Sequence, residues 1–221
     1  MERTEAIEPR AVTRLVHAAA RNTALFHYTR WIAYLGVAPR LAAALGLGDG
    51  ERLLDVGCGT GFFARLARGP YVGFDTALPS LAFGRRRHSP ARHAFLVMSA
   101  THLGLADARV DRALIVNVAH HLTDGALDDL LRDLRRVVTK RVVLVDLDPD
   151  NGNPLENWFM RHDRGAFLRS REEMRRLAAR HWIVEGEALF HNALHTQPQM
   201  LFSLAPPAAA TERQFPSGLR T

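Results

Sequence analysis

Short apolar runs alternate with amphipathic stretches through the middle of this chain, which predicts that strands and helices follow one another in turn. The apolar runs contain few polar residues, and each is only a few residues long. Such strands are buried on both faces, as in a parallel sheet that helices cover. We expect strands over residues 52–56, 71–75, 94–98, 112–118 and 141–146, with helices over residues 62–68, 78–87 and 125–138.

The two ends of the chain break this alternation. Apolar residues at helical spacing predict helices over residues 11–45, up to the glycine-rich stretch 46–50. After the fifth strand, a polar helix is expected over 172–180, followed by strands over 181–190 and 197–204. These last two strands leave no room for a helix between them. They therefore predict a hairpin that adds antiparallel pairing to one edge of the sheet.

Length and composition limit the class of protein. The chain has 221 residues, of which 47% are hydrophobic and 24% charged, as expected for one soluble globular domain. No apolar run is long enough to cross a bilayer, and the N-terminus lacks the pattern of a secretory signal. Cys58 is the single cysteine, which excludes an internal disulfide and a cysteine-based zinc cluster. We therefore expect a cytoplasmic protein with no membrane association and no metal.

The net charge of +6 raises the question of a nucleic-acid partner. The arginines are spread along the chain, except for Arg85, Arg86 and Arg87. That triplet stands where a surface helix is expected to end, and cations there stabilise the helix dipole. Since the sequence lacks a broad basic stretch with interleaved aromatic residues, we expect no nucleic-acid partner.

A glycine-rich turn follows the first predicted strand. Gly57, Gly59 and Gly61 let the backbone turn tightly and let a ligand lie against the main chain. A dinucleotide loop would need its third glycine at position 62, where this chain has Phe62. The preceding acid, Asp55, suits an ammonium group better than a pyrophosphate. S-adenosylmethionine (SAM) carries an ammonium and a sulfonium group but no phosphate, so the loop predicts a SAM site.

A second acid supports this prediction. Asp75 ends the second predicted strand, where a carboxylate can accept hydrogen bonds from both ribose hydroxyls. Phe74, Thr76 and Ala77 around it are candidates for the adenine wall. Cys58, inside the glycine loop, is expected to act as a small packing residue rather than a redox group.

Residues 52–145 resemble the class I family of SAM-dependent methyltransferases. Residues 54–61 match the first motif of that family almost residue for residue, and residues 72–75 resemble its ribose motif. Residues 99–103 stand at its adenine-contacting turn, and residues 116–122 resemble its fourth-strand segment, which ends in His-His-Leu. The resemblance implies methyl transfer and a Rossmann-like sheet of about seven strands, mostly parallel with an antiparallel C-terminal strand.

We therefore predict a three-layer α/β fold with three parts along the chain. Residues 1–45 form an N-terminal helical cap, and residues 46–204 form the SAM-binding methyltransferase domain. Within that domain, residues 151–180 are an insertion that covers the substrate. The Pro/Ala-rich residues 205–221 are a peripheral tail.

The resemblance also implies which residues contact SAM. One position departs from the family, which usually has an acid where this chain has Ser99. A hydroxyl can still accept a bond from the adenine amino group, so we expect weaker adenine recognition. The predicted cofactor contacts are Asp55, Gly57, Cys58, Gly59, Gly61, Phe62, Asp75, Thr76, Ser99, Ala100, Thr101, Asn117 and Val118.

Methyl transfer from a sulfonium needs a positioned acceptor and the exclusion of water, and it needs a general base only when the acceptor's pKa is high. His120 and His121 follow the fourth strand and are the candidate bases. For each the alternative is a structural histidine bonded to the backbone, and His121 holds the family's more regular position. Asp146, which ends the fifth strand, is either the base or a group that orients a histidine.

The acceptor pocket is expected between the N-terminal helices and the insertion. The predicted substrate-binding residues are Tyr28, Trp31, Trp158, His162 and Arg164. Ordinary core packing is the alternative for the aromatic residues. The insertion adds Arg169, and a mixture of aromatic and cationic groups suits a small planar or acidic acceptor.

Three functions are compatible with these features. The first is methyl transfer to oxygen, nitrogen or carbon of a small molecule, in secondary metabolism. The second is an RNA or protein methyltransferase, although residues 117–120 read Asn-Val-Ala-His and lack the Asn-Pro-Pro-Tyr type of motif of amide-nitrogen methylators. The third is SAM binding without methyl transfer, for a cyclisation or rearrangement, because the same loop serves all these uses.

Overall fold

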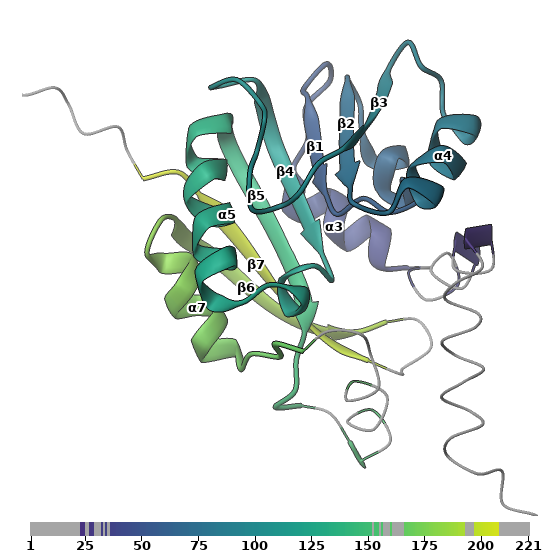
Figure 1. Ribbon diagram of the computed structural model, residues 1–221. Helices are drawn as coiled ribbons and strands as arrows, with labels where there is room; N and C mark the ends of the chain where they lie inside the picture. The colour runs from purple at the N-terminus through teal and green to yellow at the C-terminus, as the bar shows by residue number, and fades with distance from the viewer. Residues whose placement is uncertain are drawn as a thin grey trace, which may run out of the picture.

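The structure is a computed structural model that describes residues 23, 24, 27, 28, 32, 34, 36–151, 153, 154, 156, 160, 166–192 and 197–207. Its strands form one twisted sheet with helices on both faces (Figure 1). The first half contains α3 (Val37–Leu45), β1 (Leu53–Val56), the 3-10 helix η1 (Phe62–Leu66), β2 (Tyr71–Asp75), α4 (Leu78–Arg87) and β3 (His93–Val97). The second half contains β4 (Val110–Val116), the 3-10 helix η2 (Ala119–His121), α5 (Asp124–Val137), β5 (Val138–Leu147), α7 (Arg171–Ala179), β6 (Ile183–His191) and β7 (Pro198–Ala205).

The sheet has seven strands in the order β3-β2-β1-β4-β5-β7-β6. β1 to β5 are parallel to one another, and β7 is antiparallel to both β5 and β6. The order reverses between β1 and β4, which is where open α/β sheets bind their ligands. These observations confirm the predicted Rossmann-like fold and the C-terminal hairpin.

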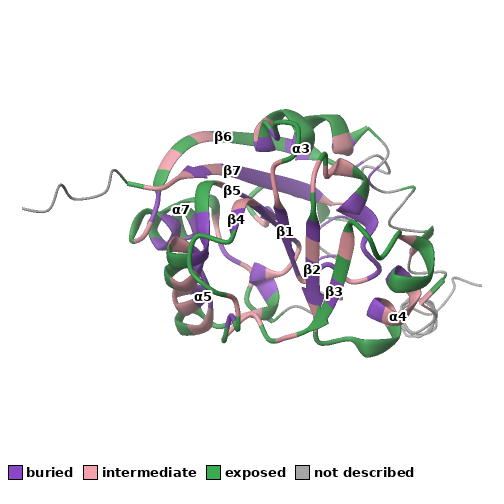
Figure 2. Cartoon of the chain, turned by 90° about the horizontal axis from the view of Figure 1, so that it is seen from above, coloured by how far each residue is buried: buried purple, intermediate pink, exposed green. Residues whose placement is uncertain are grey.

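Two apolar cores lie on opposite faces of the sheet, because successive strand residues point to opposite sides. Leu54 of β1 belongs to the core under α5 and α7, while its neighbour Leu53 belongs to the core under α3. Seen from above, the central strands are mostly buried and the helices expose their outer faces (Figure 2). Helix α5 supplies one apolar face to the first core with fully buried residues: Leu127, Leu130, Leu131, Leu134 and Val137.

Two predicted helices differ in the structure. The predicted helix 62–68 is only a five-residue 3-10 helix, because the left-handed Gly61 starts it and extended backbone at Ala67 ends it. Within the predicted helical stretch 11–45, Gly36 has a φ of 80° and breaks the helix, so α3 begins at Val37. Most of residues 1–35, the residues from 208 onward and part of the insertion 151–180 lie outside the described residues. The division into cap, insertion and tail therefore stays a prediction.

Charged residues hold α3 against the edge of the sheet where the strands begin. Arg112 Nη1 donates to the carbonyl oxygen of Leu45 at 2.6 Å, which satisfies a carbonyl at the helix C-terminus. Arg112 Nε and Lys140 Nζ also bind Glu51, at 2.7 and 2.5 Å. Side-chain hydrogen bonds from Arg112 and then Lys140 lower the pKa of the Glu51 carboxyl to about 2. Part of the positive charge of the chain therefore has a structural role at this edge.

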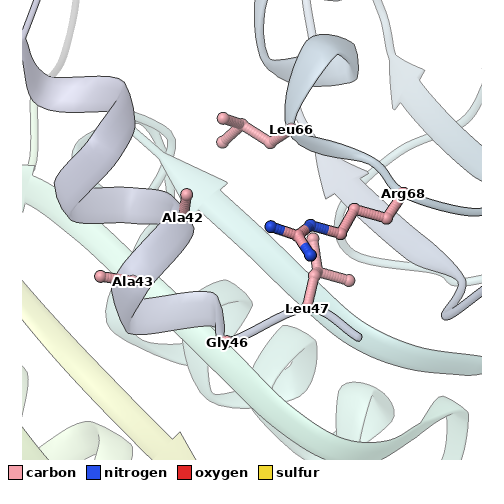
Figure 3. A pocket seen from close by; sticks show the side chains of 6 residues that line it. All are labelled: Ala42, Ala43, Gly46, Leu47, Leu66 and Arg68. Carbon is pink, nitrogen blue, oxygen red and sulfur yellow. The ribbon is translucent and has the colours of Figure 1, made fainter. Parts of the chain in front are cut away.

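A small hollow lies at the same edge (Figure 3). It has a volume of about 250 Å³ and is bounded by the end of α3 and the segment after η1. Because the glycine loop follows the other end of β1, this hollow is separate from the predicted SAM site. Its lining residues are Ala42, Ala43, Gly46, Leu47, Leu66 and Arg68.

The remaining basic cluster ends α4, as predicted. Arg85 Nη2 donates to the carbonyl oxygen of Phe95 at 2.5 Å, and Arg87 lies over the ring of Phe83 at 5.0 Å. Among the described residues, no helix is long and apolar enough to span a membrane.

Candidate functional site

The glycine loop lies at the carboxyl end of β1 and packs tightly against its neighbours. Gly57, Gly59 and Gly61 all have left-handed backbone, with φ of 63°, 54° and 71°. A Cβ on Gly57 would lie 2.5 Å from Val118 Cγ2, and one on Gly61 would lie 2.5 Å from Phe95 Cε1. Both φ and the packing against Val118 and Phe95 therefore require glycine at positions 57 and 61, and this fixes the course of the loop that is predicted to hold the cofactor.

Asp75 is positioned at the end of β2 beside this loop. Its Oδ2 accepts a hydrogen bond from the Gly59 backbone N–H, and its Oδ1 accepts one from the Ala77 N–H, both at 2.8 Å. A carboxylate oxygen can accept a second bond, so each oxygen retains capacity for a ribose hydroxyl. The position and chemistry of Asp75 therefore fit the ribose of SAM.

Asp55 and Cys58 lie buried beneath the loop. Asp55 is 1% exposed and accepts a hydrogen bond from the Tyr71 hydroxyl at 2.7 Å. Burial and then the negative charges of Asp55 and Asp75 raise the pKa of the Cys58 thiol above its usual range. The thiol is therefore neutral and buried, in agreement with a packing role. A contact between Asp55 and the SAM ammonium group stays a prediction.

The predicted adenine turn follows β3. Ser99 Oγ accepts a hydrogen bond from the Thr101 N–H at 3.2 Å and lies 2.8 Å from Thr101 Oγ1. Thr101 Oγ1 is in turn 3.1 Å from His102 Nδ1. Ser99 thus stabilises the turn itself while staying exposed, and its contact with adenine stays a prediction, as do those of Thr76 and Ala100.

Asn117 directly follows β4 and has a left-handed φ of 54°, which is uncommon for a residue with a side chain. Its Nδ2 donates to the Tyr34 hydroxyl at 2.5 Å, and its backbone N–H donates to the Val145 carbonyl at 2.9 Å. The bond to Tyr34 places the N-terminal part of the chain against the carboxyl edge of the sheet.

His27 makes a second connection of this kind. Its Nδ1 lies 2.8 Å from Thr60 Oγ1 in the glycine loop, and its ring packs against Phe62 and Phe83. This residue was not predicted to belong to the site, because a histidine in an apolar helical pattern does not indicate its partner. Together with Tyr34, His27 covers the loop from the N-terminal side.

The three predicted catalytic residues come together at the ends of β4 and β5. The Asp146 side chain accepts the His120 backbone N–H through Oδ2 at 2.9 Å and lies 2.5 Å from His120 Nδ1 through Oδ1. Both side chains are buried, with 3% of His120 and 1% of Asp146 exposed. The His121 ring is exposed and lies 4.2 Å from the His120 ring. Asp146 thus orients His120 through Nδ1, one of the two roles that the sequence left open for it.

Arg169 has a different position from the one predicted. We expected it among acceptor-binding groups, yet the side chain is 4% exposed and its donors bind the turn after β4. Nη1 donates to the Ala119 carbonyl at 2.8 Å, and Nη2 donates to the Leu122 carbonyl at 2.6 Å. Nε also binds Asp124 at 2.8 Å. Arg169 therefore holds the turn that carries His120 and fastens the segment before α7 to it.

The predicted acceptor contacts are described only in part. Tyr28 is 50% exposed, and its hydroxyl accepts a hydrogen bond from Arg87 Nη2 at 3.4 Å. Its role toward an acceptor stays a prediction. The other four residues lie outside the described part of the chain: Trp31, Trp158, His162 and Arg164.

A family comparison decides how this geometry is to be interpreted. Residues 54–146, from the strand before the glycine loop to Asp146, match a family model described as a methyltransferase domain. Over these residues the chain matches the methyltransferase domain of the class I SAM-dependent methyltransferases. Its cofactor is SAM, and the bare glycine backbone and Asp75 fit that cofactor. No protein of curated function matches the sequence of this methyltransferase.

Solved structures share the fold of this methyltransferase at low sequence identity. The Haloferax volcanii methyltransferase in complex with the Trm112 methyltransferase activator aligns with a TM-score of 0.72 and 15% identity, covering 88% of this chain and 96% of that chain. Geranyl diphosphate C-methyltransferase from Streptomyces coelicolor A3(2) has a TM-score of 0.66 and 16% identity, covering 78% and 76%. The 4+2 cyclase SpnF has a TM-score of 0.64 and 16% identity, covering 78% and 80%. At these identities the likeness establishes the fold alone.

Proposed function

We propose that this enzyme transfers the methyl group of SAM to a small-molecule acceptor. The strongest support is that segments from both sides of the methyltransferase domain in the sequence contact the site. His27 and Tyr34 bind the glycine loop and Asn117 from the N-terminal side, and Arg169 binds the turn after β4 from the C-terminal side. A site covered from both ends of its own chain suits a small enclosed molecule better than a macromolecule.

The charges at the carboxyl edge also favour a small molecule over a nucleic acid. The buried carboxylates there are Asp146, Asp148 and Glu156, and the buried Arg169 binds backbone carbonyls and Asp124. Nucleic acids require cations that face the phosphate backbone. In the described residues, the buried groups at this edge are therefore unsuited to a polyanion.

The chemistry divides between the cofactor and the residues of the chain. SAM, when bound, supplies a methyl group activated by its sulfonium. The chain must hold the acceptor atom about 3–3.5 Å from the methyl carbon and exclude water. For an acceptor with an O–H or N–H bond, His120, which Asp146 orients through Nδ1, accepts the released proton. That proton then passes from the imidazole to solvent.

The test uses SAM with a labelled methyl group. The enzyme is incubated separately with a mixture of small metabolites, with total RNA and with total protein, and the labelled product and S-adenosylhomocysteine are measured. We expect label in the small-metabolite fraction and one equivalent of S-adenosylhomocysteine. Label confined to RNA or protein would contradict the proposal, as would a metabolite converted while SAM stays intact. The last outcome would favour the cyclisation or rearrangement that the sequence left open.

A further inference from the structure

Gln199 is an unusual buried residue near the start of β7. Its side chain has no solvent exposure. Within the described part of the chain, neither Oε1 nor Nε2 has a hydrogen-bond partner. Buried amides are nearly always paired, because burying one without a partner is costly. The donor and acceptor of Gln199 therefore require a partner that the described residues do not supply.

The register of the sheet places Gln199 at the edge that carries the active site. It is opposite Leu147, the last residue of β5, and one step along the strand from the pair that contains Asp146. Alternation along β7 puts it on the same face as Leu201, which packs in the core under α3. Asp146 pairs with Met200, which belongs to the opposite core. Gln199 is thus one residue along β7 from the partner of Asp146, but its side chain lies on the face toward Tyr34, which is the opposite face of the sheet from that of the Asp146 side chain.

A second unpaired amide atom lies on that face. Asn117 Oδ1 is buried and without a partner among the described residues, while its Nδ2 binds Tyr34. Asn117 follows β4, and β5 separates β4 from β7. Two strand spacings amount to about 10 Å, which a small organic molecule can span. The two amides therefore mark opposite ends of one apolar wall, which Val145 and Leu201 of the α3 core help to form.

The surroundings of Gln199 favour a neutral ligand. Phe190 of β6 is its partner across the strand, and Phe190 and Leu201 are both buried in the α3 core. The nearby carboxylates Asp148 and Glu156 already accept bonds from Asp150 N–H and Asn153 N–H. A charged ligand group would be costly to bury among the apolar side chains around Gln199. A neutral amide or hydroxyl would instead pair with both atoms of Gln199.

We infer that Gln199 is a substrate-recognition residue, which binds a neutral hydrogen-bonding group, an amide or a hydroxyl, on an otherwise apolar acceptor. Asn117 Oδ1 marks the other end of that site. The inference rests on the proposed small-molecule methyl transfer and adds the chemical class of the acceptor. The unpaired amide discriminates against apolar analogues, since an analogue without the polar group leaves it unsatisfied.

The experiment measures the binding of three probes to the protein saturated with S-adenosylhomocysteine. Benzamide carries a donor and an acceptor, toluene carries neither, and benzoate carries a charge. We compare wild type with Gln199→Met, which keeps the side-chain length without the amide. Gln199→Asn, which keeps the amide on a shorter side chain, is the second variant. Ser203→Ala, on the same face of β7 but farther from the carboxyl edge, is the matched control.

We expect wild type and Ser203→Ala to bind benzamide at least tenfold more tightly than toluene or benzoate. In Gln199→Met this preference should disappear, while the melting temperature stays equal or rises because an unpaired buried amide is removed. Gln199→Asn should give an intermediate preference. A wild type with no preference for benzamide, or a preference that persists in Gln199→Met, would overturn the inference. Failure of the wild type to bind S-adenosylhomocysteine would contradict the proposed function instead.

Discussion

The two edges of the sheet differ in the polar residues that they carry and in how those residues are bonded. At the edge where the strands begin, Glu51 pairs with Arg112 and Lys140, and Arg112 also binds the end of α3. At the edge where the strands end, the backbone of Asn117 is left-handed and the amide of Gln199 lacks a partner among the described residues. At the first edge the Glu51 carboxylate is paired twice, although within the described part of the chain Arg141 Nε is buried without a partner and Ala108 has a left-handed φ of 49°. At the second edge, both Asn117 and Gln199 have buried amide atoms without a partner among the described residues.

This difference separates stability from function. Paired charges at the first edge stabilise the folded chain and need no ligand. Strained backbone and unpaired buried groups cost stability, and they concentrate where a protein binds or reacts. We therefore expect substitutions at the carboxyl edge to change binding and turnover, and substitutions at the amino edge to change the free energy of unfolding.

The largest effect is expected for His120→Gln. Glutamine cannot accept the acceptor's proton, so turnover of a hydroxyl acceptor should fall about 10²- to 10⁴-fold, the usual contribution of a general base. SAM affinity, measured by calorimetry, should change little. His121→Gln is the control, because His121 is exposed and Asp146 orients its neighbour. A larger loss in His121→Gln than in His120→Gln would reverse the assignment of the base.

Asp75→Ala should weaken SAM binding by about 2–3 kcal/mol, since it removes a charge-assisted acceptor for the ribose. Calorimetry with SAM measures this directly. Asp49→Ala, at the amino edge, is the matched control, since the side chain of Asp49 is 93% exposed. Unchanged SAM affinity in Asp75→Ala would refute the predicted binding mode.

Glu51→Gln tests the amino edge. The folded-state pKa of Glu51 is lowered from 4.5 to about 2, so its contribution is present above pH 4.5 and is lost as the pH falls toward 2. Allowing for solvent screening, we expect about 1–2 kcal/mol of unfolding free energy at pH 7. Urea unfolding of wild type and variant should differ at pH 7 and converge near pH 2. SAM affinity at pH 7 should not change. A change in SAM affinity would contradict the expectation that the amino edge contributes to stability and not to binding.

The smallest effect is expected for Asp49→Asn. Its ion pair with Arg68, at 3.4 Å, is exposed on both sides, and such pairs contribute about 0–1 kcal/mol. Urea unfolding at low and high salt should show a small difference that salt removes. A loss of unfolding free energy comparable to that of Glu51→Gln would contradict the expectation that the more buried ion pair contributes more to stability.

Much of the fold could be predicted because its signals are local. The strand predicted over 71–75 and the helix predicted over 78–87 have the observed bounds, since a short apolar run and a basic helix end mark them. The helix predicted over 62–68 was wrong in type, because the chain from Gly61 to Ala67 is too short and too constrained at both ends for more than a 3-10 turn. Apolar spacing also missed the break at Gly36, whose backbone is left-handed.

The candidate site could be predicted in part. The glycine loop and Asp75 carry their chemistry in a contiguous motif. By contrast, Asn117 and Tyr34 are 83 positions apart, His27 and Thr60 are 33 apart, and Arg169 and Ala119 are 50 apart. Single polar residues at such separations have no periodicity that reveals their partners. The contacts that cover the site could therefore not be predicted from the sequence.

By itself, the sequence determined the order of strands and helices, the SAM loop and the identity of the candidate catalytic residues. These features depend on neighbouring residues, whose spacing sets backbone conformation and local chemistry. Only the tertiary structure decided that Asp146 orients His120, that Arg169 supports a turn instead of an acceptor, and that Gln199 is buried without a partner among the described residues. Those facts depend on which distant groups share a buried space, and burial is a property of the folded chain as a whole.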